Sequence, residues 1–269
     1  MNVTELASID GRITPTAEAT IPLPDDGLYR GDGVFEVARL YGGRPFAMDE
    51  HWDRLERSAA KIDLPVDRAA LEDALEPLLS EAGDVEANLR VVVTRGGRHI
   101  LLIEEPFPYA DSATVATVTY QPTVILNVVK SLSYAANMHA TRIAKERGAD
   151  EAIFVTPDGT VLEAPTSSLF WAGADGVLKT PSLDNPILDS ITRDRVVREV
   201  EVEEGVYDVA ELKAASEAFM ASTGREVQPI SAIDGAELEW PGPLTTAAME
   251  AFRNCIDSEL GAAASGGAL

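Results

Sequence analysis

One lysine of this chain has surroundings that suit covalent chemistry. Four of its five lysines lie in polar or amphipathic stretches, whereas Lys130 ends the apolar run ILNVVK and is followed by the turn-like SLSY. An apolar environment disfavours the ammonium form, so the amine of such a lysine can act as a nucleophile or form a Schiff base with a carbonyl compound. The alternative is a lysine at a strand edge whose ammonium group extends into water.

A carboxylate lies in a second apolar run. Glu163 is part of VLEAPTSSLF, which passes from branched apolar residues to small hydroxylated ones. A carboxylate in such a place is costly unless it is paired. Glu163 is therefore predicted either to bind a protonated ring nitrogen or to form a structural ion pair.

Two segments have the features of phosphate-binding turns. In ILDSITRDRVV, Ser190 or Thr192 can cap a helix, and the backbone N–H groups near Ile191 and Thr192 then point out of its N-terminus, where an anion is favoured. In MASTGREV, a predicted strand runs into Ser222, Thr223 and a glycine. An ordinary helix cap and an ordinary turn are the alternatives.

An arginine completes this set of residues. Arg54 lies in the helical pattern HWDRL, where its guanidinium can bind a phosphate in a bidentate manner or remain a solvated helix charge. An amine for an aldehyde, a carboxylate for a pyridinium and several phosphate ligands are together what an electron-sink cofactor needs.

Predicted helices and predicted strands alternate along the chain, and they must position these residues. Amphipathic spacing, with Asp49 as the cap of the first helix, predicts helices over 50–62, 67–83, 134–148, 191–205, 208–216 and 245–260. Runs rich in β-branched residues predict strands over 88–97, 114–120, 122–129, 151–164 (two strands around an Asp-Gly turn), 167–173 and 218–223. We therefore expect an α/β (α+β) protein with two lobes.

A polar, proline-rich stretch, PFPYADSAT, predicts the boundary between the lobes. We expect a small N-terminal α/β domain over residues 1–108, an interdomain linker over 109–116 and a C-terminal domain over 117–269. Lys130 and Glu163 then belong to the C-terminal domain, and Arg54 belongs to the N-terminal one.

The composition limits the classes of partner. The 22 Lys and Arg residues against 45 Asp and Glu residues give a formal charge of −23, which disfavours nucleic acids and anionic membranes. The lone Cys255 excludes an intrachain disulfide framework, and the three histidines disfavour a multi-histidine site, so no metal is expected. The sequence has neither a secretory signal pattern nor an uncharged run of about 18 residues, and we expect a cytoplasmic protein.

The ordered motifs resemble those of the class IV (fold type IV) pyridoxal-phosphate-dependent aminotransferases. This group includes D-amino acid, branched-chain and (R)-amine transaminases and aminodeoxychorismate lyases. The resemblance runs from about Asp25 to Asp234 and includes RGDGVFEVARLYGGRPFAMDEHWDRLERS, the stretch from KSLSYAAN to SSLFW, ILDSITRDRV and ASTGREVQPI. It implies a larger C-terminal pseudo-barrel domain that binds pyridoxal 5'-phosphate, and a homodimer whose active sites share residues of both subunits.

The resemblance also implies roles for single residues. Lys130 matches the catalytic lysine that forms a Schiff base with the cofactor, and Glu163 matches the partner of the pyridine nitrogen. Tyr134 falls where the family often has a tyrosine near the phenolic oxygen of the cofactor. The residues implied to bind the phosphate are Arg54, Ile191, Thr192, Ser222 and Thr223.

Substrate recognition departs from the family pattern. The D-amino acid branch traps the substrate carboxylate with an arginine and a histidine one residue apart, whereas TRGGRHI has a different spacing. Phe35 stands where that branch often has a tyrosine. Solvent-facing or interface salt bridges are the alternative role of the arginines. The candidate substrate-binding residues are Arg30, Phe35, Arg90, Arg95, Arg98 and His99.

We expect an enzyme that moves an amino group between an amino acid and a 2-keto acid by a ping-pong mechanism, with D-amino acids favoured. Branched-chain L-amino acid transamination, (R)-amine transamination and aminodeoxychorismate lysis are the alternatives, and Val37, where typical lyases have a threonine, disfavours the last. A degenerate cofactor-binding protein and an acidic scaffold are the non-enzyme alternatives. The presence of Lys130, Glu163 and Arg54 argues against the degenerate protein, and a scaffold would explain the charge but not the ordered motifs.

Overall fold

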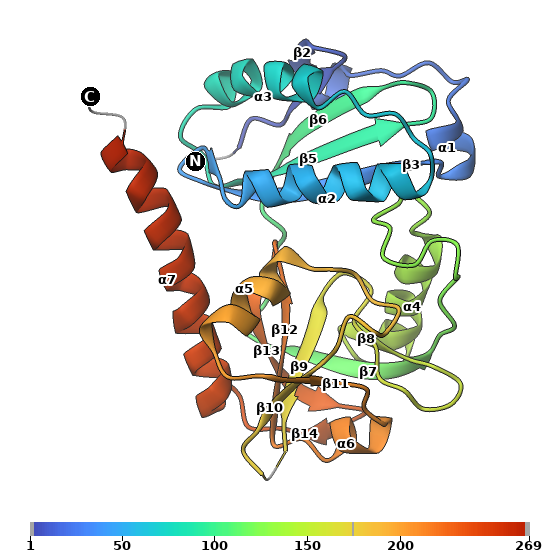
Figure 1. Ribbon diagram of the computed structural model, residues 1–269, viewed down its shortest axis with the longest axis vertical. Helices are drawn as coiled ribbons and strands as arrows, with labels where there is room; N and C mark the ends of the chain where they lie inside the picture. The colour runs from blue at the N-terminus through green and yellow to red at the C-terminus, as the bar shows by residue number, and fades with distance from the viewer. Residues whose placement is uncertain (1–2, 174, 267–269) are drawn as a thin grey trace. The chain divides into compact units, whose positions relative to one another are not determined.

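The chain forms two compact units (Figure 1). The computed structural model describes residues 3–173 and 175–266, with side chains as far as residue 261. Unit 1 consists of Met1–Phe107 and Val129–Tyr134, and unit 2 of Pro108–Val128 and Ala135–Leu269. The short segment that carries Lys130 therefore belongs to unit 1.

This division differs from the predicted one. Val129–Tyr134 returns to unit 1, and Ala113–Thr119, which overlaps the predicted linker, is a strand. The N-terminal domain over 1–108, the linker over 109–116 and the C-terminal cofactor-binding domain over 117–269 remain a prediction, and residues 174 and 267–269 lie outside the described residues.

Unit 1 is built on a six-stranded antiparallel sheet in the order β2-β1-β6-β5-β3-β4. Its strands are β1 (Leu6–Ile9), β2 (Arg12–Pro15), β3 (Gly33–Tyr41), β4 (Arg44–Pro45), β5 (Ala87–Thr94) and β6 (His99–Glu104). Side chains alternate between the two faces of a strand. Val34, Ala38 and Leu89 thus face the core, whereas Phe35 and Arg90 lie on the opposite face.

Two long helices cover the core face of this sheet (Figure 1). The helices of unit 1 are α1 (Asp26–Arg30), α2 (Met48–Lys61) and α3 (Arg68–Ala82), besides a 3-10 turn at Thr16–Glu18. Trp52 and Leu55 of α2 and Leu71 and Leu78 of α3 pack into one buried cluster with the strands. Burial of such side chains stabilises each by about 1.5–3 kcal/mol.

Of the two helix boundaries predicted in this unit, one is confirmed and the other is wrong. The prediction that the second helix ends at Gly83 is confirmed. Asp49 was predicted to cap the first helix, which is wrong, because α2 already begins at Met48 after Ala47, a residue in the left-handed conformation at φ 56°. Asp49 lies inside the first turn, where its charge still interacts favourably with the helix dipole.

Unit 2 is built on a mixed eight-stranded sheet in the order β11-β10-β9-β12-β13-β7-β8, with β14 paired to β13. Its strands are β7 (Ala113–Thr119), β8 (Glu151–Val155), β9 (Ser168–Ala172), β10 (Leu178–Pro181), β11 (Glu203–Gly205), β12 (Glu217–Ser222), β13 (Glu226–Ile233) and β14 (Ala236–Glu237). Strand β7 pairs in parallel with β8 and β13, and β10 pairs in parallel with β11. The remaining pairs are antiparallel.

The helices of unit 2 are α4 (Ala135–Glu146), α5 (Ile191–Glu199), α6 (Val209–Lys213) and α7 (Pro243–Gly266). Helix α4 packs on β7 and β8, and α7 packs against α5, β12 and β13 (Figure 1). The predicted helix over 191–205 is wrong in its second half, because residues 203–205 pair with β10 as a strand. The second strand predicted in 151–164 is reduced to isolated bridges such as Val155–Val161.

The predicted strand over 122–129 is also wrong. Residues 124–128 form a bend and turn, in which Val128 has a positive φ of 59°. Val124 and Ile125 are 91% and 86% exposed. The β-branched composition favours a strand locally, but no neighbouring strand supplies these residues with ladder hydrogen bonds in the described structure.

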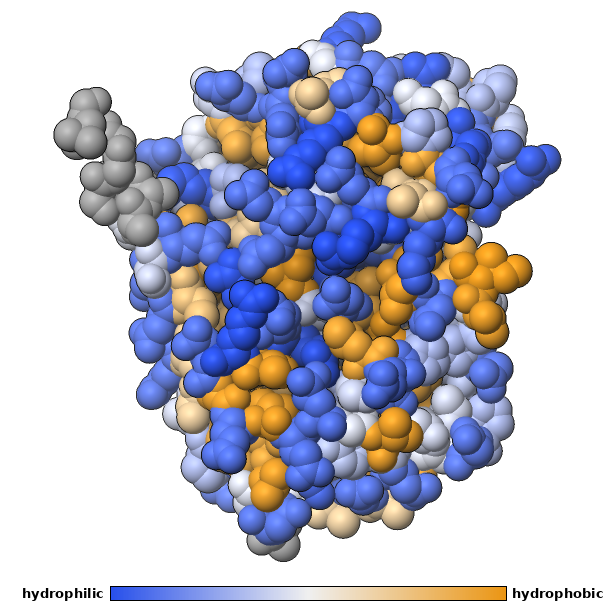
Figure 2. All heavy atoms as spheres, in the orientation of Figure 1, coloured by the Kyte–Doolittle hydropathy of each residue, from blue (hydrophilic) through white to orange (hydrophobic). Residues whose placement is uncertain are grey.

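The surface in view in Figure 2 is mainly hydrophilic, with apolar residues gathered in a few patches. This fits a chain in which charged residues make up 25% of the sequence. Among the described residues, no helix combines the length and the apolar character needed to cross a membrane.

Candidate active site

Lys130 lies against the edge of strand β3 in unit 1. Its carbonyl accepts a hydrogen bond from Phe35 N at 3.0 Å, and its N–H donates to Ser58 Oγ of α2 at 3.2 Å. Leu132 N donates to Gly33 O at 2.9 Å. The predicted place of Lys130 at the end of a buried strand is therefore wrong: the lysine is half-buried and follows a turn, and β3 holds its backbone.

The ammonium group of Lys130 lies near two aromatic rings. Nζ is 4.4 Å from the centroid of the Phe35 ring and 5.9 Å from that of Tyr134, and the two rings meet edge to face at 5.3 Å. The guanidinium of Arg90 lies 5.8 Å from the Phe35 ring. Contacts of this kind attract a cation to the ring face. An amine, a guanidinium and two aromatic rings thus gather on one side of unit 1.

Arg54 is held by a buried carboxylate that the sequence analysis missed. Its Nε donates to Glu36 Oε1 at 2.7 Å and its Nη2 to Glu36 Oε2 at 2.6 Å. His51 Nδ1 donates to the same Oε2 at 2.8 Å. Glu36 is 0% exposed and lies on the core face of β3 between Val34 and Ala38. Arg54 and His51 project from one face of α2, because they are three residues apart.

This network fixes the charges of its members. Burial acts to raise the pKa of Glu36, but the charge and hydrogen bonds of Arg54, together with the bond from His51, outweigh it and hold the pKa at about 2. Burial lowers the pKa of His51, and the charges of Arg54 and Lys130 lower it further against the opposing effect of Glu36. At neutral pH the network therefore contains a carboxylate, a guanidinium and a neutral imidazole.

A sequence signal for Glu36 exists. Strand β3 reads GVFEVARLY, and Glu36 shares the parity of the core-facing Val34 and Ala38. A carboxylate on a core face needs a cationic partner. Arg54 in the following helix is such a partner. The sequence alone does not pair it with Glu36, because the pairing depends on which face of β3 meets α2.

In unit 2, Glu163 accepts a hydrogen bond from the backbone of the segment that leads into α5. Leu188 N donates to Glu163 Oε1 at 3.0 Å. Burial raises the pKa of Tyr120, and the negative charge of Glu163 raises it further. The carboxylate is half-buried, and its hydrogen bond ties it to the entrance of α5, three residues before Ile191.

The N-terminus of α5 has the donors of an anion site. Ser190 is the cap: its Oγ accepts from Arg193 N at 3.3 Å, and its carbonyl accepts from Asp194 N at 2.9 Å. The N–H groups of Ile191 and Thr192 belong to the first turn, where a helix offers them no acceptor of its own. These two donors and the dipole of α5 fit a phosphate.

The second candidate phosphate turn joins β12 to β13. Ser222 ends β12, and its Oγ accepts a hydrogen bond from Arg225 N at 3.4 Å across the turn. Ser222 and Thr223 are half-buried. Helix α5 packs beside β12, so both candidate phosphate turns belong to neighbouring elements of unit 2.

The candidate substrate arginines differ in their partners. Arg90 donates from Nε to both oxygens of Glu104 at 3.0 Å, on the sheet face that carries Phe35. Arg95 pairs with Asp32 at 3.1 Å and donates to the carbonyls that follow α2. Arg95 thus fastens the end of α2 to the turn after β5.

The remaining candidates lie toward the surface of unit 1. Arg98 pairs with Asp10 at 2.6 Å, and His99 N donates to the same carboxylate at 2.9 Å. Arg30 pairs with Asp26 at 3.3 Å, and its side chain is 74% exposed. The structure thus brings Arg90 together with Phe35 and Lys130 and places Arg95 and Arg98 in separate ion pairs.

The candidate cofactor residues fall into two sets. Unit 1 contains Lys130, Tyr134 and Arg54, and unit 2 contains Glu163 and the two candidate phosphate turns. That the two sets form one site stays a prediction. Among the described residues, no three His, Cys, Asp or Glu side chains gather as ligands for a metal ion.

The chain is similar to known proteins over most of its length. The sequence model described as amino-transferase class IV matches residues 33–233. A D-alanine aminotransferase of Listeria monocytogenes serotype 1/2a (strain 10403S) is 33% identical over 265 residues, which cover 88% of this chain and 91% of the relative. A putative branched-chain-amino-acid aminotransferase of Methanocaldococcus jannaschii is 34% identical over 274 residues, which cover 91% and 94%.

A solved structure shares the fold as well. The fold IV-transaminase CpuTA1 from Curtobacterium pusillum has a TM-score of 0.81 at 29% identity, over 90% of this chain and 96% of that chain. The chain belongs to the class IV aminotransferases, and its mixed α/β fold with two sheets is that of the fold type IV transaminases. The protein is thus an aminotransferase of a family that uses pyridoxal phosphate, and the predictions of family, fold class and enzyme class are confirmed.

Proposed function

We propose that the protein transfers an amino group between an amino acid and a 2-keto acid by a ping-pong mechanism on pyridoxal phosphate, with D-amino acids favoured as donors. The observation that carries this proposal is the position of the Lys130 amine, 4.4 Å from the Phe35 ring that Arg90 also contacts. A nucleophilic amine and a guanidinium at one aromatic ring suit a substrate that has a carboxylate beside its reacting carbon. The D-alanine aminotransferases among the relatives support D-amino acids.

The residues present fit the cofactor. The N–H groups of Ile191 and Thr192 and the hydroxyls of Ser222 and Thr223 would bind its phosphate. Arg54 would bind it too, with its guanidinium oriented by Glu36. Glu163 would pair with the ring nitrogen, and Tyr134 would lie near the phenolic oxygen.

When bound, the cofactor supplies an electron sink for the negative charge that develops at the substrate α-carbon. Lys130 Nζ acts first as a general base and accepts the proton of the substrate α-carbon. It then acts as a general acid and would donate this proton to the C4′ carbon of the cofactor. The Glu163 carboxylate keeps the ring nitrogen protonated. Arg90 orients the substrate by its carboxylate, and Arg30 is the second candidate for this role.

Arg90 is itself paired with Glu104 and is favoured for its contact with the Phe35 ring, whereas the contacts of the other substrate candidates suit structural roles. Arg95 and Arg98 hold Asp32 and Asp10, and His99 lies in β6 beside the same Asp10. Substrate binding by these three residues is the weaker proposal. Phe35 would form one wall of the substrate site through its contact with Lys130.

A branched-chain L-amino acid transaminase is the second candidate function. The 34% identical relative from Methanocaldococcus jannaschii supports it. Both activities need the same amine and the same electron sink, so they differ only in how the substrate carboxylate and side chain are bound. Transfer from (R)-amines and lysis of aminodeoxychorismate remain the further alternatives.

A half-reaction distinguishes these candidates. D-alanine, D-glutamate, L-leucine, L-glutamate and (R)-1-phenylethylamine are added separately to the yellow holoenzyme, and loss of the absorbance band at about 400–420 nm is followed. We expect the two D-amino acids to bleach the band fastest. Bleaching by L-leucine and L-glutamate alone would replace the proposal by the branched-chain function. A yellow protein that no donor bleaches would support the lyase or a degenerate cofactor binder.

We also propose a cytoplasmic homodimer in which residues of both subunits complete each active site. The strongly exposed Val124 and Ile125 support an association surface, because adjacent exposed apolar residues are favoured at contacts between chains. The proposed small-molecule partners are amino acids and 2-keto acids.

A further inference from the structure

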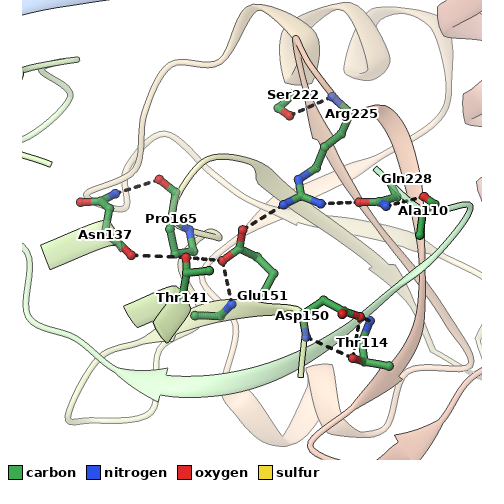
Figure 3. A network of polar contacts seen from close by, with 11 residues as sticks. Ala110, Thr114, Asn137, Thr141, Asp150, Glu151, Pro165, Ser222, Arg225 and Gln228 are labelled. Atoms are coloured by element: carbon green, nitrogen blue, oxygen red, sulfur yellow. Dashed lines mark hydrogen bonds and ion pairs between the residues drawn. The ribbon is translucent and has the colours of Figure 1, made fainter. Parts of the chain in front are cut away.

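Arg225 follows the candidate phosphate turn directly and sends its side chain into the interior of unit 2. Figure 3 shows its guanidinium between Glu151 and Gln228. Nη2 donates to Glu151 Oε2 at 2.9 Å, and Nη1 donates to Gln228 Oε1. The side chains of Arg225 and Glu151 are only 8% and 5% exposed. An ion pair with so little access to water has well-defined geometry, because its members cannot exchange their protein partners for water.

The partners of Arg225 are themselves fixed. Glu151 Oε1 accepts from Thr141 Oγ1 of α4 at 2.5 Å and from Ala152 N at 3.0 Å. Gln228 Nε2 donates to Ala110 O at 2.7 Å. The guanidinium also lies 4.2 Å from the centroid of the Tyr109 ring. Arg225 thus ties the turn after β12 to β8, β13 and the segment before β7, and through Glu151 the network extends to α4.

The same network reaches the segment that follows Glu163. Thr141 Oγ1 contacts Asn137 O at 3.4 Å, and Asn137 Nδ2 donates to Pro165 O at 2.8 Å (Figure 3). Pro165 is two residues beyond Glu163, the proposed partner of the ring nitrogen. The network therefore runs from the turn that would bind the phosphate to the segment that would bind the ring.

We propose that Arg225 is a positioning residue for the cofactor phosphate: its buried guanidinium, held in one plane by Glu151 and Gln228 together, fixes the Ser222–Thr223 turn in the conformation that binds the phosphate. This inference rests on the proposed function of that turn. Thr223 is two residues from the anchored side chain, and Arg225 N also bonds Ser222 Oγ within the turn. Ordering one residue of backbone costs about a factor of ten in an equilibrium constant, and a turn that is ordered in advance avoids this loss on binding.

The test compares a ligand that has the phosphate with one that lacks it. Apoenzyme of the wild type and of Arg225→Lys is titrated with pyridoxal phosphate and with pyridoxal, and both dissociation constants are measured from the absorbance of the bound form. Arg225→Lys keeps the positive charge and can still pair with Glu151, but a single ammonium cannot also hold Gln228 in the same planar geometry. The comparison therefore reports on geometry at nearly constant charge.

We expect Arg225→Lys to weaken pyridoxal phosphate binding about tenfold while pyridoxal binding changes less than about twofold. A merely structural role would weaken both ligands by the same factor and would overturn the inference. If Arg225→Lys does not fold, Gln228→Ala, which keeps the ion pair, tests the same ratio and is expected to shift it in the same direction.

Arg253→Ala is the matched control. Arg253 pairs with Glu226, the residue after Arg225, at 2.7 Å, but its side chain is 51% exposed. We expect both dissociation constants to stay at the wild-type values. An equal selective loss in this variant would contradict a special role of the buried pair. A wild-type apoenzyme that fails to bind pyridoxal phosphate at all would instead defeat the proposed function.

Discussion

Among single residues, Lys130 is the one whose loss should affect the reaction most. We expect Lys130→Ala to remove the absorbance band at about 400–420 nm and to lower the rate of transamination by at least about 10³-fold, because no other described amine lies at Phe35. The measurements are the holoenzyme spectrum and the D-alanine half-reaction. Lys145→Ala, at an exposed position of α4, is the control and should leave both unchanged. An unaltered band in Lys130→Ala would contradict the assignment.

The buried Glu36 predicts a dependence of stability on pH. Its pKa falls from 4.5 to about 2 on folding, so its contribution to the free energy of unfolding is fully present above pH 4.5 and is lost as the pH falls toward 2. We expect Glu36→Gln to lower the unfolding free energy at pH 7 by about 3–5 kcal/mol, because it leaves Arg54 as a buried charge without its carboxylate. The difference from the wild type should shrink as the pH falls toward 3.

Urea unfolding at pH 7 and at steps down to pH 3 checks this expectation. Glu72→Gln is the matched control in the same unit, since Glu72 pairs with Arg68 at 2.7 Å but is 47% exposed. An exposed pair of this kind contributes about 0–1 kcal/mol, so this variant should follow the wild type at every pH. A Glu36→Gln deficit that is equally large at pH 3 and pH 7 would show that lost packing, and not charge, is its cause.

At the scale of elements, the N-terminus of α5 allows one backbone donor to be removed without breaking the helix. Ile191 is the first residue of α5, a position where proline is tolerated, and Ser190 has φ −83° and ψ 126°, which a following proline permits. We expect Ile191→Pro to fold but to weaken pyridoxal phosphate binding about tenfold or more, because one charge-assisted hydrogen bond to the phosphate is lost.

Titration of the apoenzyme measures this loss, and circular dichroism checks the fold. Ile191→Val shortens the same side chain and keeps the N–H, so it should bind the cofactor like the wild type. If both variants weaken binding equally, the side chain of Ile191 and not its N–H group is responsible. The proposal that the N-terminus of α5 binds the phosphate would then not be supported.

The elements also show what the sequence could predict. The second helix was found with its end at Gly83 because the apolar spacing and the terminating glycine are local signals. The predicted strand over 122–129 is wrong because a strand also needs a neighbouring strand, and among the described residues the contacts with β3 begin beyond this range, at Lys130 and Ser131. The local reason for choosing Lys130, a strand before it, is wrong, because residues 124–128 form a bend and turn; its role in the reaction stays a prediction. Arg54 was identified from the sequence, but its pairing with Glu36 across 18 residues depends on which face of β3 meets α2.

At the scale of the whole molecule, the charge of −23 predicts how the proposed dimer responds to salt. Two identical acidic subunits repel each other, and this repulsion extends over about 30 Å at 0.01 M salt but only about 8 Å at 0.15 M. We expect sedimentation velocity to give twice the subunit mass of 28.7 kDa, with a dissociation constant that falls as NaCl is raised from 10 to 300 mM. Potassium chloride at the same ionic strengths should act equally, since screening does not depend on the cation.

A constant mass of 28.7 kDa at every salt concentration would contradict the dimer, and with it the sharing of active-site residues between subunits. A dimer that weakens with added salt would instead mean that attractive ion pairs across the interface outweigh the repulsion of the net charge.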